Sequence, residues 1–179
     1  MSGNEQSGML VHGSLMVGYA QACKNLNIVA GRAAHTFIDK LEINNWYPLE
    51  QWRELEHLVL RSYSRVEPIL VRVGVEMMMG WYHFGPGRNL IKNGAAFLHF
   101  QTGSQGFTSV VQGSPEQIGT FDMDFYDRRR GRAVIHSTTP FNRWMERGVL
   151  IGGMSAPGDL DYVDVLVGED PDLLHCEFH

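Results

Sequence analysis

The chain has 179 residues, of which 44% are hydrophobic and 20% are charged, and its formal net charge at pH 7 is −5. These values are ordinary for a globular domain, so they exclude a disordered chain, and the negative charge argues against a general nucleic-acid binder, whose affinity comes from neutralised phosphates. No apolar run approaches the roughly 20 residues that span a bilayer, and the start "MSGNEQSGML" lacks the basic and apolar regions of a signal peptide.

The ends of the chain and its cysteines indicate how it is organised. We expect residues 1–9 to form a flexible tail and residues 10–179 to form a single domain. Cys23 and Cys176 stand far apart in the sequence and form no metal-type pair. Because no export signal precedes them, we expect both to be reduced thiols in a cytoplasmic protein.

Up to about residue 93, the spacing of apolar residues is helical. It predicts helices in residues 13–26, 31–43, 44–65 and 66–84. Pro48 suits the first turn of the third helix, where its missing N–H group costs nothing. The fourth helix is apolar on nearly all sides, which is typical of a central helix. Gly74 and Gly80 within it are expected to allow a neighbouring backbone to approach closely.

After a break at residues 85–94, alternation with the period of a strand dominates. It predicts strands in residues 95–102, 106–113, 117–127, 130–138, 159–168 and 172–179, with one helix at 139–153. The basic run at residues 128–132 is interpreted as a solvated hairpin tip. The predicted class is therefore α+β, with a helical half at residues 10–93 and a mostly antiparallel sheet with one covering helix at 94–179. If the strands flanking the covering helix are parallel neighbours, their crossover should be right-handed.

The stretch "IHSTTPFNRWMERGVLIGG", residues 135–153, has two interpretations: a catalytic constellation, or a strand followed by a helix. The second is favoured, because Thr139 suits the N-cap, Pro140 the first turn, and Gly152 with Gly153 a stop. On one strand, His136 and Ser137 would point to opposite faces, so they do not form a catalytic pair. The charged residues of the helix are expected to face water; these are Arg143, Glu146 and Arg147.

The eight histidines form no HxH, HxxxH or HExxH pattern, so no metal site is predicted. A haem ligand needs no such spacing, and His83, at the end of the most apolar helix, is the best candidate for one. A core or capping role for His83 is the more common alternative. No catalytic residue is predicted.

The nine methionines and four tryptophans suit either a filled core or an adaptable ligand pocket. Successive helical residues point about 100° apart, so Met77, Met78 and Met79 are not expected to share one contact surface. We expect a space between the two halves that binds a small apolar ligand. The residues predicted to line it are Met78, Trp81 and Trp144, with His83 or Tyr82 as the polar group.

The order of these elements resembles that of the 4-vinyl-reductase domain and of related haem–NO-binding-like sensor domains. Their fold group also contains the ligand-binding subunits of the Golgi transport (TRAPP) complex. The stretches that carry the resemblance are "VHGSLMVGYAQACKNL", "NNWYPLEQW", "FQTGSQGFTSVVQGSPEQIGTFDMDFYD", "STTPFNRWMERGVLIGGM" and "GDLDYVDVLVGEDPDLLHCEF".

The chain departs from these families at specific positions. Met154 and Tyr162 stand where 4-vinyl-reductase domains often have cysteines. "SYSR", at residues 62–65, has the residue types of the propionate-binding Tyr-x-Ser-x-Arg motif at a different spacing. The resemblance therefore implies the fold and a small apolar pocket, and no cofactor is predicted.

The resemblance implies a non-catalytic small-molecule sensor or interaction module of the bacterial regulatory type. Its signal would pass through a protein partner or a homodimer, without nucleic acid and without a membrane span. Two alternatives stay open: a haem-based gas sensor, and an enzyme of unknown reaction.

Overall fold

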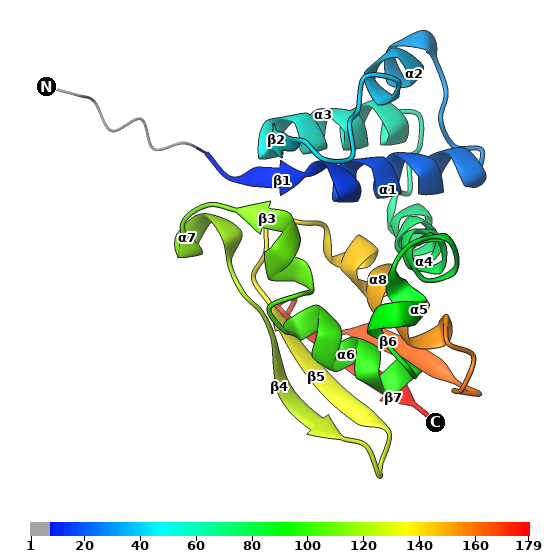
Figure 1. The fold of residues 1–179 in the computed structure, drawn as a ribbon, viewed down its shortest axis with the longest axis vertical. Coiled ribbons are helices and arrows are strands. Elements are labelled where there is room, and N and C mark those ends of the chain that lie inside the picture. The colour runs from blue at the N-terminus through cyan, green and yellow to red at the C-terminus, as the bar shows by residue number, and fades with distance from the viewer. Residues whose placement is uncertain (1–7) are drawn as a thin grey trace, which may run out of the picture.

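The computed structural model describes residues 8–179, and it stacks a layer of helices on a four-stranded antiparallel sheet (Figure 1). The predicted α+β class is confirmed. Residues 1–7 of the expected tail lie outside the described residues. Met9 is buried, and its carbonyl accepts a 3.0 Å hydrogen bond from the N–H group of Leu49, so the tail does not include residue 9. Within the described residues, no helix combines the length and the apolarity needed to cross a bilayer.

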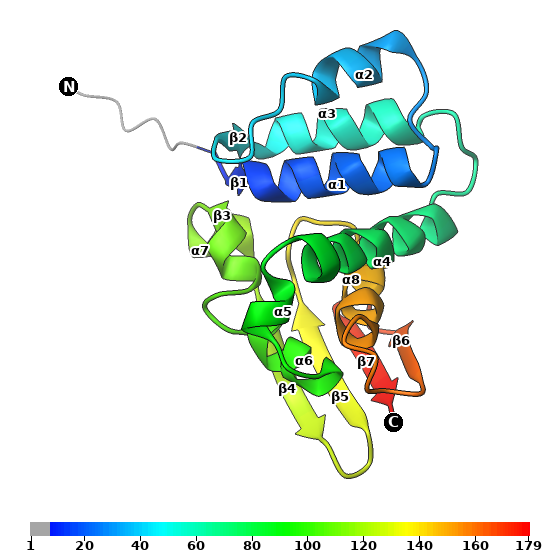
Figure 2. The ribbon, with the colours of Figure 1, turned by 45° about the vertical axis from the view of Figure 1, so that its right-hand side comes forward.

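Four helices form most of the N-terminal half: α1 (Gly13–Asn25), α2 (Arg32–Ile38), α3 (Leu49–Leu60) and α4 (Glu67–Phe84). The first three lie together, and α4 separates them from the sheet (Figure 2). This position confirms that α4, apolar on nearly all sides, is central. The helix α2 ends before residue 43, and α3 begins at Leu49, directly after Pro48, and fills only the middle of residues 44–65.

A small antiparallel sheet joins the start of the chain to its middle. It consists of β1 (Leu10–His12), β2 (Trp46–Pro48) and β3 (Val111–Gln112), with β1 in the centre. Strand β3 is the remnant of the strand predicted at residues 106–113, because Phe107–Val110 form the 3₁₀ helix η1 instead. The helix α7 (Pro115–Ile118) follows, and its N-cap Ser114 forms a capping box with Gln117.

The strand predicted at residues 95–102 is wrong, since this segment is the helix α6 (Gly94–Thr102). The side chain of Asn93 caps it by accepting a 2.8 Å hydrogen bond from the N–H group of Ala96. A short helix, α5 (Gly87–Leu90), occupies the break before it. The helical part of the chain thus extends to residue 102 rather than 93.

The larger sheet consists of β4 (Phe121–Asp127), β5 (Arg132–Ser137), β6 (Val163–Val167) and β7 (Leu173–Phe178), in the order β4-β5-β7-β6. Every neighbouring pair is antiparallel. Strands β5 and β6 therefore run parallel, but β7 lies between them, so they are not the parallel neighbours on which the crossover prediction depended. The helices α6 and α8 (Arg143–Ser155) cover one face of this sheet.

Glycines allow α4 and α8 to touch along their backbones. A Cβ atom on Gly74 would lie 2.3 Å from the carbonyl oxygen of Met145, and one on Gly148 would lie 2.0 Å from that of Val71. The expected close approach is confirmed at Gly74 but wrong at Gly80, which has nothing within 4 Å. The helix α8 runs through Gly152 and Gly153, the predicted stop, because these glycines pack against α4 and the ring of Phe97.

Candidate functional site

A cavity of about 300 Å³ lies where α1, α4, α6 and η1 meet. We refer to it as the central cavity. Its walls are mainly apolar, and the largest side chains come from α4 and α6. The residues that line it are Ser14, Leu15, Gly18, Met77, Met78, Trp81, Pro86, Leu90, Phe97, Phe100, Gln101, Gln105, Gly106, Phe107, Ser109 and Val110.

A smaller space of about 50 Å³, the inner pocket, lies next to the central cavity and reaches α8. Five residues line both spaces: Leu15, Met78, Gln101, Phe107 and Val110. The inner pocket adds Met145, Glu146 and Val149 from α8, and Phe121 and Phe141 from the sheet side of the molecule. The two spaces together connect the helical layer to the helix that covers the sheet.

The polar groups of the central cavity are neutral. They are the hydroxyl groups of Ser14 and Ser109 and the amides of Gln101 and Gln105. None of the four was predicted from the sequence; the two glutamines were hidden because Gln101 fell in a predicted strand and Gln105 in the turn after it. One signal in the sequence could have shown that Gln101 is on a helix. Asn93 is a typical N-cap residue, and Phe97 follows it at helical spacing, one turn before Gln101.

Two of the five predicted ligand-binding residues, Met78 and Trp81, line the central cavity. Met77 lines it as well, whereas Met79 does not, so the three methionines do not all share one contact surface, although two of them do. Gly74, Met77, Met78 and Trp81 follow one another at positions i, i+3, i+4 and i+7, which form one stripe of a helix.

The other three predicted residues lie outside the lining of both spaces. His83 is exposed, and its Nδ1 lies 3.1 Å from the guanidinium group of Arg88. The same guanidinium group lies 5.7 Å from the centre of the Tyr82 ring. Trp144 is on α8, where its ring is covered by the guanidinium group of Arg147 at 5.8 Å.

The stretch at residues 135–153 forms a buried hydrogen-bonded cluster around Glu146, which is 5% exposed. The hydroxyl group of Ser137 donates to both carboxylate oxygens, at 3.0 and 2.9 Å. Thr139 and Arg143 also donate to this carboxylate. Burial raises the pKa of Glu146 above its usual range, and the charge of Arg143 and the donated hydrogen bonds oppose that rise.

This cluster corrects two expectations. Glu146 does not face water, and the side chain of Arg143 is only 16% exposed. Thr139 is not the N-cap; the cap is Asn142, whose side chain accepts a 2.9 Å hydrogen bond from the N–H group of Trp144. Pro140 therefore precedes the helix and is not in its first turn. The hydroxyl group of Thr139 donates to the buried carboxylate of Glu146, a charge-assisted bond, and accepts a 3.3 Å hydrogen bond from the N–H group of Phe141.

The cluster gives no support to the catalytic interpretation. Ser137 is fully buried, so no substrate reaches its hydroxyl group. His136 lies on the opposite face of β5, where it pairs across the sheet with Asp122 and Leu173. Within residues 8–179, no three His, Cys, Asp or Glu side chains are arranged to hold a metal ion. The arrangement instead fastens the start of α8 to the end of β5.

The sequence matches no family model and no curated protein. Among solved structures, a point variant of Tt H-NOX is similar, with 12% sequence identity, a TM-score of 0.66, and coverage of 93% of this chain and 94% of that chain. An oxygen-binding H-NOX domain related to soluble guanylate cyclases, solved as its oxygen complex, has 11% identity, a TM-score of 0.64 and the same coverage. At this identity the likeness shows the fold alone, and it confirms the expected haem–NO-binding-like fold group.

Proposed function

We propose that this chain is a non-catalytic sensor or interaction module that binds a small apolar molecule in the central cavity. The observation that carries the proposal is the composition of that cavity, which has about 300 Å³ of space, walls of Met, Trp and Phe side chains, and no charged side chain. Small-molecule sites have volumes of roughly 300–1,000 Å³ and apolar walls with a few polar groups. The fold is shared with a domain that is described as oxygen-binding, which agrees with a sensory role.

The polar groups of the cavity define the polar part of the ligand. Gln101 and Gln105 each offer a donor and an acceptor. The hydroxyl group of Ser109 donates to the carbonyl oxygens of Gln105 and Gly106, so toward a ligand it acts as an acceptor. No cation is present in the lining to pair with a carboxylate or phosphate, and burying an unpaired charge is costly. The ligand that fits is therefore neutral, mostly apolar, and able to hydrogen-bond at one end.

A chain of contacts connects this site to the surface. Glu146 and Val149 of α8 line the inner pocket. Arg143, which bonds to Glu146, also donates a 2.7 Å hydrogen bond from Nε to the carbonyl oxygen of Pro171, in the turn between β6 and β7. An occupant that displaces α8 thus acts on a surface turn, through which a partner or an oligomer receives the signal.

A haem, the cofactor of the alternative gas-sensor function, does not fit the residues of the cavity. Haem iron in proteins is held by a His, Cys or Tyr side chain, or by Met together with His. The lining contains none of the first three, and His83 is exposed outside it. The lining also has no cation to pair with the propionates. Met77 and Met78 alone are the sulfur donors.

The test uses the purified full chain and the neutral fluorescent probe N-phenyl-1-naphthylamine. We expect the probe to bind and a Met78→Trp substitution to weaken its binding at least about tenfold, because the new ring fills the space that Met78 shares between the two pockets. Met79→Trp is the matched control, since Met79 lies one position away and outside both linings. It should leave probe binding unchanged.

The thermal melt of the same variants separates a cavity from a filled core. In a filled core, the added ring of Met78→Trp costs typically about 1–3 kcal/mol. A melting temperature of Met78→Trp close to that of the unmodified chain therefore supports the proposal, and a large drop in melting temperature contradicts it. A stoichiometric Soret band after expression with a haem precursor would favour the haem alternative instead.

A further inference from the structure

The face of the larger sheet that is opposite α6 and α8, which we call the outer face, carries a row of four side chains, three of them apolar and one a histidine; we call it the apolar row. Antiparallel pairing places Phe125 opposite Val134, Val134 opposite His175, and His175 opposite Leu166. Phe125 is 49% exposed and Leu166 is 55% exposed. A sheet face that meets water normally has polar residues at such positions. The row is therefore a largely apolar surface that no segment of residues 8–179 covers.

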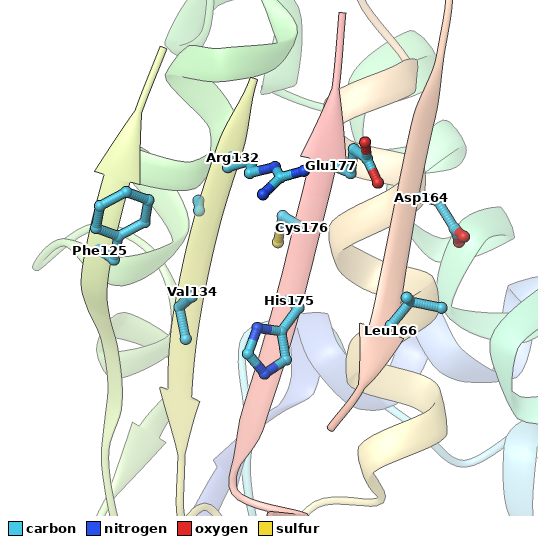
Figure 3. A pocket seen from close by; sticks show the side chains of 9 residues that line it. Phe125, Arg132, Val134, Asp164, Leu166, His175, Cys176 and Glu177 are labelled. Carbon is cyan, nitrogen blue, oxygen red and sulfur yellow. The ribbon is translucent and has the colours of Figure 1, made fainter. Parts of the chain in front are cut away.

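The outer face is also hollowed. A depression of about 300 Å³ lies over the row, with Arg132 and Glu177 beside it, and the covering helices lie behind the strands (Figure 3). The side chains of Val134 and His175 lie side by side on the two inner strands, and Phe125 and Leu166 lie on the two outer strands, one on each side of them (Figure 3). Side chains of a partner can thus enter this depression, so the contact is not limited to that between two flat surfaces.

Charge is separated along the strands of this face. At one end, the turn between β4 and β5 carries Arg128, Arg129 and Arg130, all of them exposed. The carboxylates at this end each have a cationic neighbour: Asp127 lies 3.8 Å from Arg130, Asp164 lies 3.3 Å from Arg147, and Glu177 stands opposite Arg132. Arg128 and Arg129 are therefore the excess charge of this end. At the other end, Asp122 lies opposite His136, and the turn between β6 and β7 exposes Glu169 and Asp170. The two ends are about 20 Å apart, because β5 has 6 residues and strands rise about 3.3 Å per residue. This separation exceeds the Debye length of about 8 Å, so the ends act as distinct charges.

We propose that the outer face is the interface of a homodimer, in which two copies pack face to face with their strands antiparallel. The two-fold axis lies in the plane between the two sheets and is perpendicular to the strands, so the strands of the second copy run in the opposite direction. The basic end of each copy then meets the acidic end of the other, and the two apolar rows meet in the middle. Such an interface uses the same patch on both copies, so the patch must be self-complementary. This face meets that condition because it contains both charges and the apolar row.

This proposal rests on the proposed function in one respect: it identifies the partner that receives the signal as a second copy of the chain. Formation of the dimer does not require a ligand in the central cavity. Its test is sedimentation equilibrium of the full chain without ligand, over a wide concentration range. We expect a monomer–dimer equilibrium and, for Leu166→Asp, a dissociation constant at least about tenfold higher. The matched control is Ile43→Asp, because Ile43 is also 55% exposed but lies before β2, away from the outer face. Circular dichroism checks that each variant is folded.

Charge reversal tests the antiparallel arrangement itself. The variant with Arg128→Glu and Arg129→Glu should be monomeric, and so should the variant with Asp122→Arg and Glu169→Arg, because each then meets like charges in a second copy. An equimolar mixture of the two variants should restore a dimer. A wild-type chain that stays monomeric at all concentrations overturns the proposal. A dimer that Leu166→Asp leaves intact, or a mixture that stays monomeric, also overturns it. Failure of probe binding in the cavity affects none of these outcomes.

Discussion

Gly74 of α4 and Gly148 of α8 stand back to back where the two helices cross, and a Cβ atom on Gly148 would lie 3.0 Å from the Cα atom of Gly74. Because the atoms that a new methyl group would meet here belong to backbones, neither helix can yield by changing a side-chain rotamer. The crossing therefore fixes how α4 is rotated about its own axis, and with it which side chains reach the central cavity.

The first prediction concerns this crossing. Gly74→Ala and Gly148→Ala should each lower the free energy of unfolding by about 1–3 kcal/mol or more, the usual cost of overpacking. Gly80→Ala is the control on the same helix, since nothing lies within 4 Å of its new methyl group. It should be neutral or stabilise the protein by up to about 1 kcal/mol. Urea unfolding measures all three, and equal effects at Gly74 and Gly80 would contradict the close crossing.

The second prediction concerns the buried carboxylate. Glu146→Ala should cost up to about 3–5 kcal/mol, because it removes the buried carboxylate that pairs with the largely buried guanidinium group of Arg143. Asp172, 3.6 Å away, and the carbonyl oxygen of Pro171 remain as partners of Arg143 and limit the loss. Glu146→Gln should cost less, since its amide oxygen still accepts from the two hydroxyl groups. In a double-mutant cycle, Arg143→Ala should cost less in the Glu146→Ala background than alone. Additive losses would show that the two side chains do not interact.

The third prediction concerns the start of α8. Asn142→Ala should lower the free energy of unfolding by about 1 kcal/mol through loss of the N-cap, and Asn142→Ser should restore most of that loss. Thr139→Val tests the competing assignment, because it removes the hydroxyl group and keeps the shape. If Thr139 acts through Glu146, the loss caused by Thr139→Val should shrink when Glu146 is already replaced by Ala, which removes the acceptor of the threonine hydroxyl group. An unchanged loss in that background would argue for a cap.

The fourth prediction concerns pH. Burial raises the pKa of Glu56, and the charge of Arg53 opposes the rise. The Oε2 atom of Glu56 is buried without a hydrogen-bond partner in the part of the chain that the structure describes. The folded protein then holds the proton more tightly than the unfolded chain, so this residue's contribution to stability is present below the ordinary glutamate pKa of about 4.3. It is lost as the pH rises through the raised value.

Glu56→Gln should therefore flatten the fall of the melting temperature between mildly acidic and neutral pH, and stabilise the protein at neutral pH. Glu50→Gln, an exposed position on the same helix, is the control. Glu146 titrates in the same direction, so some slope should persist in the Glu56→Gln variant. A slope identical to that of the unmodified chain would contradict the role of Glu56.

Much of the fold was predictable because its signals are local. Helical spacing placed α1 and α4, and alternation placed β4, β5, β6 and β7 near their observed positions. The helix α6 was missed because "AAFLHFQT" is a short apolar run, which fits a buried helix as well as a strand. Its cap, Asn93, is the local sign that distinguishes the two.

The site was less predictable, because it depends on contacts between distant segments. Met78 and Trp81 belong to the stripe that begins at Gly74, and that stripe faces the cavity only because α8 packs against the glycine. The sequence did not contain the rotation of α4, so Tyr82 and His83, on the next face, were included. The burial of Glu146 was likewise hidden, since its partners become visible only once α8 folds back on β5.

The place of β7 between β5 and β6 determines when this sheet can form during synthesis. Strand β6 has no other neighbour in the sheet, so it stays unpaired until residues 173–178 have left the ribosome. Until then α8, which precedes β6, has only part of the surface that it covers in the finished fold. We conclude that the helical layer and the β4–β5 hairpin can form before β7 has been synthesised, whereas β6 joins the sheet only after it. A nascent chain arrested before residue 173 would expose the edges of β5 and β6, so it should be the form most prone to aggregation.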